Sequence, residues 1–337
     1  MAATVTIRDV AKRAGVGVGT VSRVLNDSDA VRESTRSRVQ AAIEDLDFSP
    51  SPLARRLSSG KAMAIGVIVP FFTNASVVRR LQGIVSVLAS SEYDLVLFDV
   101  ENTENNDVLL TNIVQRKLVD GMLILSLRPM DSDMERFLQA GVPAVIVDAR
   151  HPELTSIFVD NVQGGKQATQ HLINLGHEKI GYISDYPNNP FNFSPVHDRL
   201  QGYIFAIEEA GIPYNHEYYR VGGLDSQEAR QQAHDLLNLP DPPTAIFAYS
   251  DTQAVGVLEA ARDLGLHVPT DLSVIGYDDI EVAQYLQLTT IRQRLFDSGV
   301  KGAQLLLDVM DDSIHEPIEL VLPTELIIRG STAVPSR

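Results

Sequence analysis

An acidic residue pair and a distant arginine stand out among the side chains that could bind a ligand. Asp278 and Asp279 directly follow an apolar run over 272–277, and Arg199 comes after a loop that contains Phe193. A carboxylate and a guanidinium each form bidentate hydrogen bonds, and an aromatic ring stacks on a flat ligand. Together, these residue types are the parts of a pocket for a sugar or a nucleobase.

Paired carboxylates also perform glycoside hydrolysis, which is the enzymatic alternative. The side chains of adjacent residues such as Asp278 and Asp279 should point in different directions, so they suit that chemistry poorly. No Ser-His-acid arrangement stands out, and His171 and His177 are too far apart in sequence for one helical metal face. The sequence therefore favours a binding protein over an enzyme, with no cofactor and no metal.

Three glycines near the amino terminus resemble a phosphate-binding loop. Gly15, Gly17 and Gly19 alternate with valines. A dinucleotide-binding loop follows a strand, however, and the pattern of residues 6–13 predicts a helix. Glycine also permits the left-handed backbone of a tight corner between two helices. The spacing therefore favours a helix-turn-helix.

The second helix of a helix-turn-helix contacts base edges in the major groove through its first exposed residues. Here these residues are Val18 and Gly19, with Arg23 one turn further on. Arg23 can bind guanine O6 and N7 through two hydrogen bonds, and Val18 can contact a thymine methyl group. A solvated helical face is the alternative interpretation. The short side chains suited to phosphates are Thr6, Thr20, Ser22 and Asn26.

Three short helices within residues 6–47 are expected to position these side chains. Thr6, with Asp9 three residues later, predicts a capped helix start. Residues 20–25 and 39–46 show the apolar spacing of two further helices. So short a segment can bury only a small core, which predicts a compact module.

From residue 62 onward, short apolar runs alternate with amphipathic helices. The runs are rich in Val, Ile and Leu and are continuous, which is typical of strands buried on both faces of a parallel sheet. They cover 64–69, 95–99, 121–125, 144–147, 179–184, 245–249 and 272–277. We therefore predict an α/β body of two doubly wound parallel-sheet subdomains, with a ligand at the carboxyl ends of the strands.

The charge distribution separates the two parts. Residues 1–61 carry ten Lys/Arg and seven Asp/Glu, a net charge of +3, whereas the rest of the chain carries a net charge of −19. Such an asymmetry is expected if only the amino-terminal part contacts phosphates. There is no cysteine among the 337 residues, and no apolar stretch predicts a signal peptide or a membrane span. These features predict a cytoplasmic protein.

The motifs, taken in order, resemble the LacI/GalR family of repressors. The amino-terminal part carries TIRDVAKRAGV at 6–16, TVSRVLN at 20–26, VRESTR at 31–36, FSPS at 48–51 and ARRL at 54–57. The body carries IGVIVP at 65–70, VDG at 119–121, LGH at 175–177, RLQGY at 199–203, SD at 250–251 and IGYDD at 275–279. The similarity covers essentially the whole chain.

The resemblance implies a domain organisation. It comprises a helix-turn-helix DNA-binding domain over 1–49, a hinge helix or linker over 50–61, and an effector-binding and dimerisation domain over 62–337. The last domain would resemble periplasmic binding proteins, with an N-subdomain of about 62–161 and 293–323 and a C-subdomain of about 162–292 and 324–337. The implied partners of this homodimer are a pseudo-palindromic operator DNA and a small-molecule effector, with no membrane.

The resemblance also assigns roles to single residues. Ala54 and Leu57 match the hinge helix that contacts DNA, with Leu57 as the side chain inserted into the minor groove. Two roles are open for Asp251: a contact to the effector or a cap on the helix that follows it. The residues matching or lying near effector contacts are Ser76, Asp148, Asp160, Phe193, Arg199, Leu224, Ser250 and Asp278.

The chain departs from the family pattern at two places, and three questions stay open. Gly17 replaces a usual serine, Val18 and Gly19 replace positions that are often polar, and residues 71–77 resemble the effector loop only loosely. A carbohydrate effector is preferred over a nucleobase or another metabolite, because acid-lined clefts suit polyols. The effector is either an inducer or a corepressor. A solute-binding protein is the alternative function for the body taken alone.

Overall fold

The computed structural model describes residues 5–25, 28–48, 61–100, 113, 117–128, 135, 138–187 and 194–336. The chain divides into two compact units, Met1–Met63 and Ala64–Arg337, and each is described by itself. No helix in the described part is long and apolar enough to cross a membrane.

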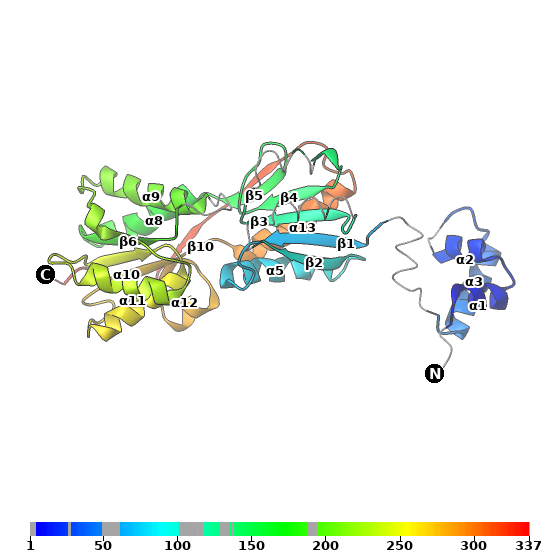
Figure 1. Ribbon diagram of the computed structural model, residues 1–337, viewed down its shortest axis with the longest axis horizontal. Helices are drawn as coiled ribbons and strands as arrows, with labels where there is room; N and C mark the ends of the chain where they lie inside the picture. Colours follow the sequence, from blue (N-terminus) through cyan, green and yellow to red (C-terminus); the bar gives the residue numbers. More distant parts are fainter. Residues whose placement is uncertain are drawn as a thin grey trace. The chain divides into compact units, whose positions relative to one another are not determined.

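The first unit, here called the head, contains helices α1 (Ile7–Ala14), α2 (Val18–Leu25) and α3 (Glu33–Asp45) (Figure 1). The Asp9 carboxylate accepts hydrogen bonds from the Thr6 backbone N–H at 2.9 Å and from the Thr6 hydroxyl at 2.7 Å, which fixes the start of α1. Gly15 ends α1 with a φ of 65°. Val10, Val21 and Val39 form the fully buried centre of a small core. Helix α2 begins two residues earlier than the apolar spacing predicts.

The second unit, here called the body, contains two six-stranded sheets with the strand orders β11-β5-β4-β3-β1-β2 and β12-β10-β9-β8-β6-β7. All neighbouring strands are parallel except β10 and β12. The strands are β1 Ala64–Val69, β2 Asp94–Asp99, β3 Gly121–Leu125, β4 Ala144–Val147, β5 Thr155–Val159, β6 Ile180–Ser184, β7 Tyr219–Val221, β8 Ala245–Ala248, β9 Ser273–Asp278, β10 Thr289–Arg292, β11 Glu319–Leu322 and β12 Glu325–Ile327.

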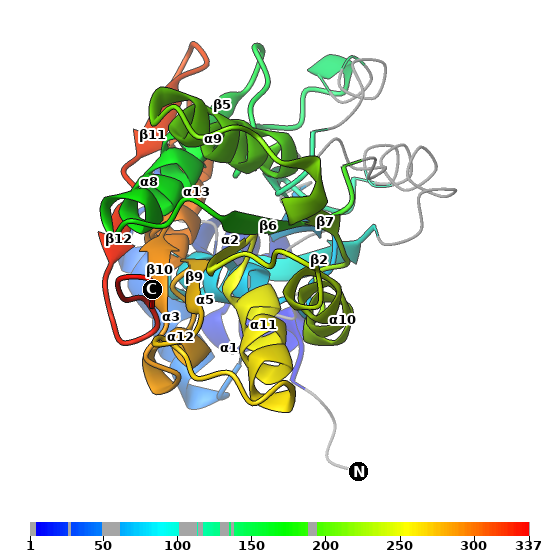
Figure 2. The same ribbon diagram turned by 90° about the vertical axis from the view of Figure 1, so that its left-hand side faces the viewer.

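Each sheet with its helices forms a lobe. The N-lobe comprises β1–β5 and β11 with α5 and α13, and the C-lobe comprises β6–β10 and β12 with the remaining helices of the body. In the C-lobe, α8 and α9 cover one face of the sheet and α10 and α11 cover the other (Figure 2). The helices are α5 Ala75–Leu88, α8 Asn161–Asn174, α9 Pro195–Glu209, the 3-10 helix η2 His216–Tyr218, α10 Ser226–Leu237, α11 Asp251–Asp263, α12 Glu281–Tyr285 and α13 Leu295–Met310.

The predicted fold class is confirmed. The seven apolar runs become β1, β2, β3, β4, β6, β8 and β9, most of them fully buried because helices cover the sheets. The runs did not include β5, β7 and β10–β12. The strands β7, β11 and β12 lie at sheet edges and are partly exposed, so they lack the continuous apolar pattern of a central strand.

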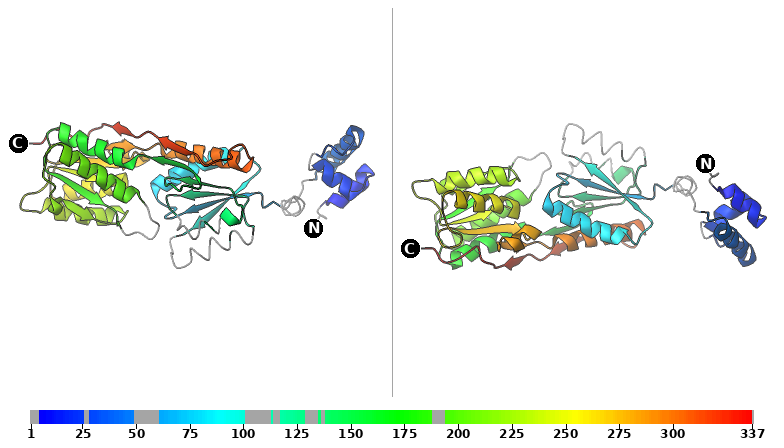
Figure 3. Two further views of the ribbon diagram at one scale, coloured as in Figure 1. Left: turned by 90° about the horizontal axis from the view of Figure 1, so that it is seen from above. Right: turned by 90° about the horizontal axis from the view of Figure 1, so that it is seen from below.

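The chain passes from one lobe to the other three times (Figure 3). The crossings join β5 to α8, β10 to α13, and β11 to β12. None is longer than two residues. The lobes are therefore connected by three short segments that lie between their sheets.

Glycines bring two helix pairs into backbone contact. A Cβ atom at Gly299 of α13 would lie 2.0 Å from the carbonyl oxygen of Arg80 on α5, and one at Gly165 of α8 would lie 2.4 Å from that of Arg199 on α9. Real Cβ atoms do not approach so closely, so only glycine fits at either position. This packing fixes the backbone at two arginines whose side chains line the pocket described next.

Candidate functional site

A pocket lies in the body at the carboxyl ends of strands from both sheets. It encloses about 670 Å³ that no protein atom fills, part of which is open to solvent. The sequence-predicted effector residues that line it are Ser76, Asp148, Arg199, Leu224, Ser250 and Asp278. Residues far apart in the sequence thus converge where the fold predicts a ligand.

Three polar pocket residues adopt positive φ angles as their strands end. Ser126 follows β3 with a φ of 53°, Asp148 follows β4 with a φ of 68°, and Asp278 ends β9 with a φ of 118°. Such angles are uncommon for residues other than glycine and cost about 1–3 kcal/mol each. The turns lie where side chains leave the sheet edge to line the pocket.

Arg199 is held rigidly at the C-lobe wall and is 2% exposed. Its Nε donates to Asn161 at 3.0 Å and one terminal nitrogen donates to the Tyr249 carbonyl oxygen at 2.7 Å. The guanidinium carbon lies 3.7 Å from the centroid of the Tyr277 ring. With its orientation fixed this way, Arg199 approaches Asp278 at 3.8 Å.

A series of polar side-chain contacts crosses the pocket from the N-lobe to the C-lobe. Arg80 of α5 contacts Asp148 at 2.9 Å and donates to the Gln293 side-chain oxygen at 3.0 Å. The Gln293 amide nitrogen then donates to Asp278. Ser126 also donates to Asp148 at 2.9 Å. Since Gln293 lies in the crossing between β10 and α13, this series of contacts passes through the connection between the lobes.

Burial controls the acidity of Asp278. It raises the pKa of this carboxyl to about 6, although the Arg199 and Arg80 guanidiniums and the Gln293 hydrogen bond act in the opposite direction. The carboxylate is therefore mostly ionised at neutral pH and available as a hydrogen-bond acceptor.

Sequence reasoning missed Arg80, Gln293 and Asp185, which also line the pocket. The signal for Arg80 is its place within the apolar face of α5, where Val77 and Ile84 are its buried neighbours. A charged residue in such a stripe is buried only when it is paired. Asp185 directly follows β6, in the same position relative to its strand as Asp148.

Two predicted effector residues are not part of this pocket as described. The Asp160 carboxylate caps α8 by accepting the Gln163 N–H at 2.9 Å and lines a separate cavity together with Asp198. Phe193 lies outside the described residues.

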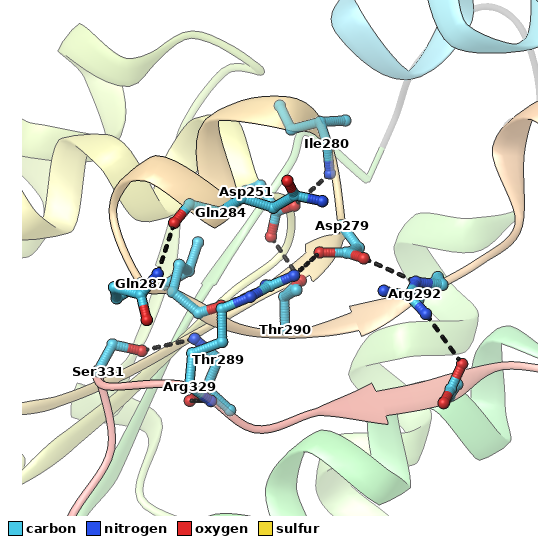
Figure 4. Close-up of polar contacts among 12 residues, drawn as sticks. Asp251, Asp279, Ile280, Gln284, Gln287, Thr289, Thr290, Arg292, Arg329 and Ser331 are labelled. Carbon is cyan, nitrogen blue, oxygen red and sulfur yellow. Dashed lines mark hydrogen bonds and ion pairs between the residues drawn. The ribbon is translucent and has the colours of Figure 1, made fainter.

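The acidic residues beside the pocket have structural partners of their own (Figure 4). The Asp279 carboxylate accepts hydrogen bonds from Arg292 at 2.7 Å and from Arg329 at 2.6 Å. Asp251 accepts the Thr290 hydroxyl and, at 2.9 Å, the Ile280 N–H. Burial, with the nearby Asp278 charge, raises the pKa of Asp251 well above its usual range. Ser250, rather than Asp251, accepts the capping hydrogen bond of α11.

The head presents most of its predicted DNA contacts on exposed surface. Val18, Gly19 and Arg23 are exposed on α2, while Val21 and Val24 of the same helix are buried. Thr20 and Ser22 are half-buried, and Thr6 is exposed at the start of α1. Asn26, Ala54 and Leu57 lie outside the described residues.

Comparisons with known proteins agree with this geometry. Residues 6–51 match the family of bacterial regulatory proteins called the lacI family, and residues 169–332 match a periplasmic binding protein-like domain. The HTH-type transcriptional repressor CytR of Escherichia coli K12 is 34% identical over 333 residues, which cover 97% of this chain and 96% of CytR.

Two solved structures resemble the chain over nearly its full length. One is a complex of the transcriptional regulator CelR with cellobiose, with 32% identity, a TM-score of 0.72, and 97% of this chain and 99% of that chain covered. The other is the lac repressor dimer bound to operator and the anti-inducer ONPF, with 28% identity, a TM-score of 0.84, and 98% and 100% covered. The chain belongs to the LacI family of bacterial regulatory proteins and is a DNA-binding transcription regulator with an effector-binding body.

Proposed function

We propose that this protein is a homodimeric repressor in the cytoplasm whose affinity for a pseudo-palindromic operator is controlled by a sugar bound between the lobes. The observation that carries the proposal is the pocket with Asp148 and Asp278 on opposite lobes, each beside an arginine. Carboxylates accept hydrogen bonds from paired hydroxyl groups, and Phe71 in the pocket lining, which is 36% exposed, offers an aromatic face. The residues favour binding rather than catalysis.

The head is proposed to read the operator through α2. Arg23 is exposed and has no ion-pair partner in the described part of the chain, so its guanidinium is free to bind a guanine edge. Val18 is 42% exposed, which leaves its methyl groups available to a thymine. The domain organisation proposed is a head over 1–49, a hinge over 50–61 that includes Ala54 and Leu57, and a body over 62–337.

Dimerisation is proposed through the N-lobe surface formed by α5 and the edge strand β2. Val78 and Val85 on α5 and Leu97 on β2 are between 38% and 48% exposed. Apolar side chains that gather on one surface mark contact sites between proteins.

Effector control is proposed to act through the connections between the lobes. A ligand that contacts Asp278 competes with the Gln293 amide for the same carboxylate. Gln293 lies in a crossing, so a change in its hydrogen bonds alters the relative position of the lobes. Such coupling is usually worth about 1–3 kcal/mol in operator affinity.

The experiment measures operator and random DNA binding by fluorescence anisotropy, using duplexes selected from a random pool and panels of sugars and nucleosides. Arg23→Ala should lose the preference for selected DNA while it retains salt-sensitive binding to random DNA. Asp278→Ala should still bind selected DNA. Its affinity for the ligand should fall at least tenfold, so that DNA binding no longer responds to the ligand. A sugar that weakens DNA binding is an inducer, and one that strengthens it is a corepressor.

If DNA binding responds to nucleosides and not to sugars, the effector is a nucleobase compound rather than a sugar. An unchanged ligand response in Asp278→Ala would place the effector site elsewhere. Equal weakening of Arg23→Ala on both kinds of DNA would show that Arg23 contacts phosphate.

A further inference from the structure

Asp185 is a pocket carboxylate whose second oxygen has no partner. It directly follows β6, lines the pocket and is 6% exposed. One oxygen accepts the Tyr186 N–H at 2.7 Å. The other accepts no hydrogen bond from any residue that the structure describes.

The other two carboxylates of the pocket differ in this respect. Asp148 contacts Arg80 at 2.9 Å and accepts the Ser126 hydroxyl. Asp278 accepts the Gln293 amide and lies 3.8 Å from Arg199. Within the described residues, Asp185 has no Lys, Arg or His nitrogen within ion-pair distance. The described lining thus contains three aspartates and two arginines, which leaves one negative charge without a matching cation.

The surroundings add to this imbalance. Glu228 on α10 lies near Asp185 and accepts the Tyr186 hydroxyl at 2.9 Å. Burial, followed in the same direction by the Glu228 charge, raises the pKa of Asp185 to about 6, while the Tyr186 hydrogen bond and Arg199 oppose the rise. The group is mostly ionised at neutral pH, and a buried carboxylate without a cationic partner is unfavourable.

We infer that Asp185 binds an amino group of the effector, so that the pocket selects an amine-bearing polyhydroxy compound such as an amino sugar. An ammonium group supplies the missing positive charge and up to three hydrogen-bond donors. The remaining hydroxyl groups can bind Asp148 and Asp278. This inference rests on the proposed function, because it assumes that the pocket is the effector site.

The test uses the full-length protein and three matched pairs of ligands: glucose and glucosamine, galactose and galactosamine, and mannose and mannosamine. Thermal shift identifies binding, because a ligand of the native state raises the apparent Tm, and calorimetry then gives the affinities. At least one amino sugar should bind ten times more tightly than its neutral counterpart. Asp185→Asn should reduce that preference to less than threefold.

Two control variants make the result specific. Glu208→Gln removes one negative charge from an exposed position of α9 and should keep the preference. Asp278→Ala should weaken binding of both members of each pair. Circular dichroism and binding to selected DNA confirm that Asp185→Asn is folded.

The inference and the proposed function fail in different ways. Amino sugars that bind no better than neutral sugars, or a preference that persists in Asp185→Asn, overturn the inference while the sugar pocket stands. A panel in which no amino sugar binds also overturns the inference. Sugar binding that is unchanged in Asp278→Ala overturns the proposed pocket itself.

Discussion

The two lobes are built alike but balance their charges differently. Each has a six-stranded sheet ending in a strand from the carboxyl-terminal part of the chain, and each packs a pocket arginine against a glycine. The N-lobe matches its one pocket aspartate, Asp148, with Arg80. The C-lobe brings two aspartates, Asp185 and Asp278, to the single guanidinium of Arg199. Among the described pocket residues, the charge of the N-lobe aspartate is matched, and the C-lobe carries the unmatched charge.

The largest effect should come from the packing that the lobes share. Gly299→Leu in the N-lobe and Gly165→Leu in the C-lobe each force a side chain against a main-chain carbonyl that cannot move alone. Each variant should lose about 4 kcal/mol or more of unfolding free energy, measured by urea denaturation. Gly211→Ala is a control, because a Cβ atom at that position meets nothing within 4 Å, although its φ of 70° costs a smaller amount. Wild-type stability in either leucine variant would contradict the close packing.

Removing the arginine of each arginine–aspartate pair should show the difference between the lobes more clearly. Arg80→Met leaves Asp148 buried without a cationic partner and should cost about 3–5 kcal/mol. Adding Asp148→Asn should recover much of that loss, because the neutral amide needs no cationic partner. Arg199→Met should recover less on adding Asp278→Asn, because Asp185 keeps its charge. Chemical denaturation of the four variants gives both comparisons, and equal recovery in the two lobes would remove the proposed difference.

A smaller effect should appear in the dependence of stability on pH. Burial raises the pKa of both Asp185 and Asp278 to about 6, above the ordinary value near 4. The folded protein therefore holds more protons than the unfolded chain between pH 4 and pH 6, so these groups lower stability as pH rises through that window. In Asp185→Asn, the decrease in unfolding free energy between pH 4 and pH 6 should be smaller than in the wild type by roughly 2–3 kcal/mol.

The matched control for this experiment is Asp160→Asn, because Asp160 is an exposed aspartate that caps a helix in the same body. A slope that changes in Asp185→Asn but not in this control would assign the effect to the buried pocket carboxyl. Effector affinity should fall below pH 6, because the ionised carboxylates are the ligand-binding forms. A slope in Asp185→Asn identical to that of the wild type would show that Asp185 titrates normally.

Sequence patterns could predict the alternation of buried strands and helices because helices on both faces leave a strand no polar side. They could also predict Asp278 at the pocket, because carboxyl ends of parallel strands meet at one edge. The same rule applied to Asp185 would have found it, since it directly follows the run 179–184. The helical spacing of Val77 and Ile84 would likewise have identified Arg80, rather than Arg79, as the inward-facing arginine. No pattern could show that Asp148 is its partner, because that ion pair joins residues far apart in the sequence and depends on how the elements pack.

The crossings between the lobes have a consequence for biosynthesis. The N-lobe sheet includes β11, which ends at Leu322, and its strands β3–β5 pack against α13, yet β5 already ends at Val159. At ordinary synthesis rates, the last strand of that sheet emerges roughly 8–30 s after the first five. During this interval the nascent chain exposes the edge of β5 and the apolar faces of β3 and β4 that α13 later covers. The N-lobe is thus begun before the C-lobe and completed after almost all of it, so an unpaired strand edge and uncovered apolar faces persist for that interval, and such surfaces favour pairing with other chains.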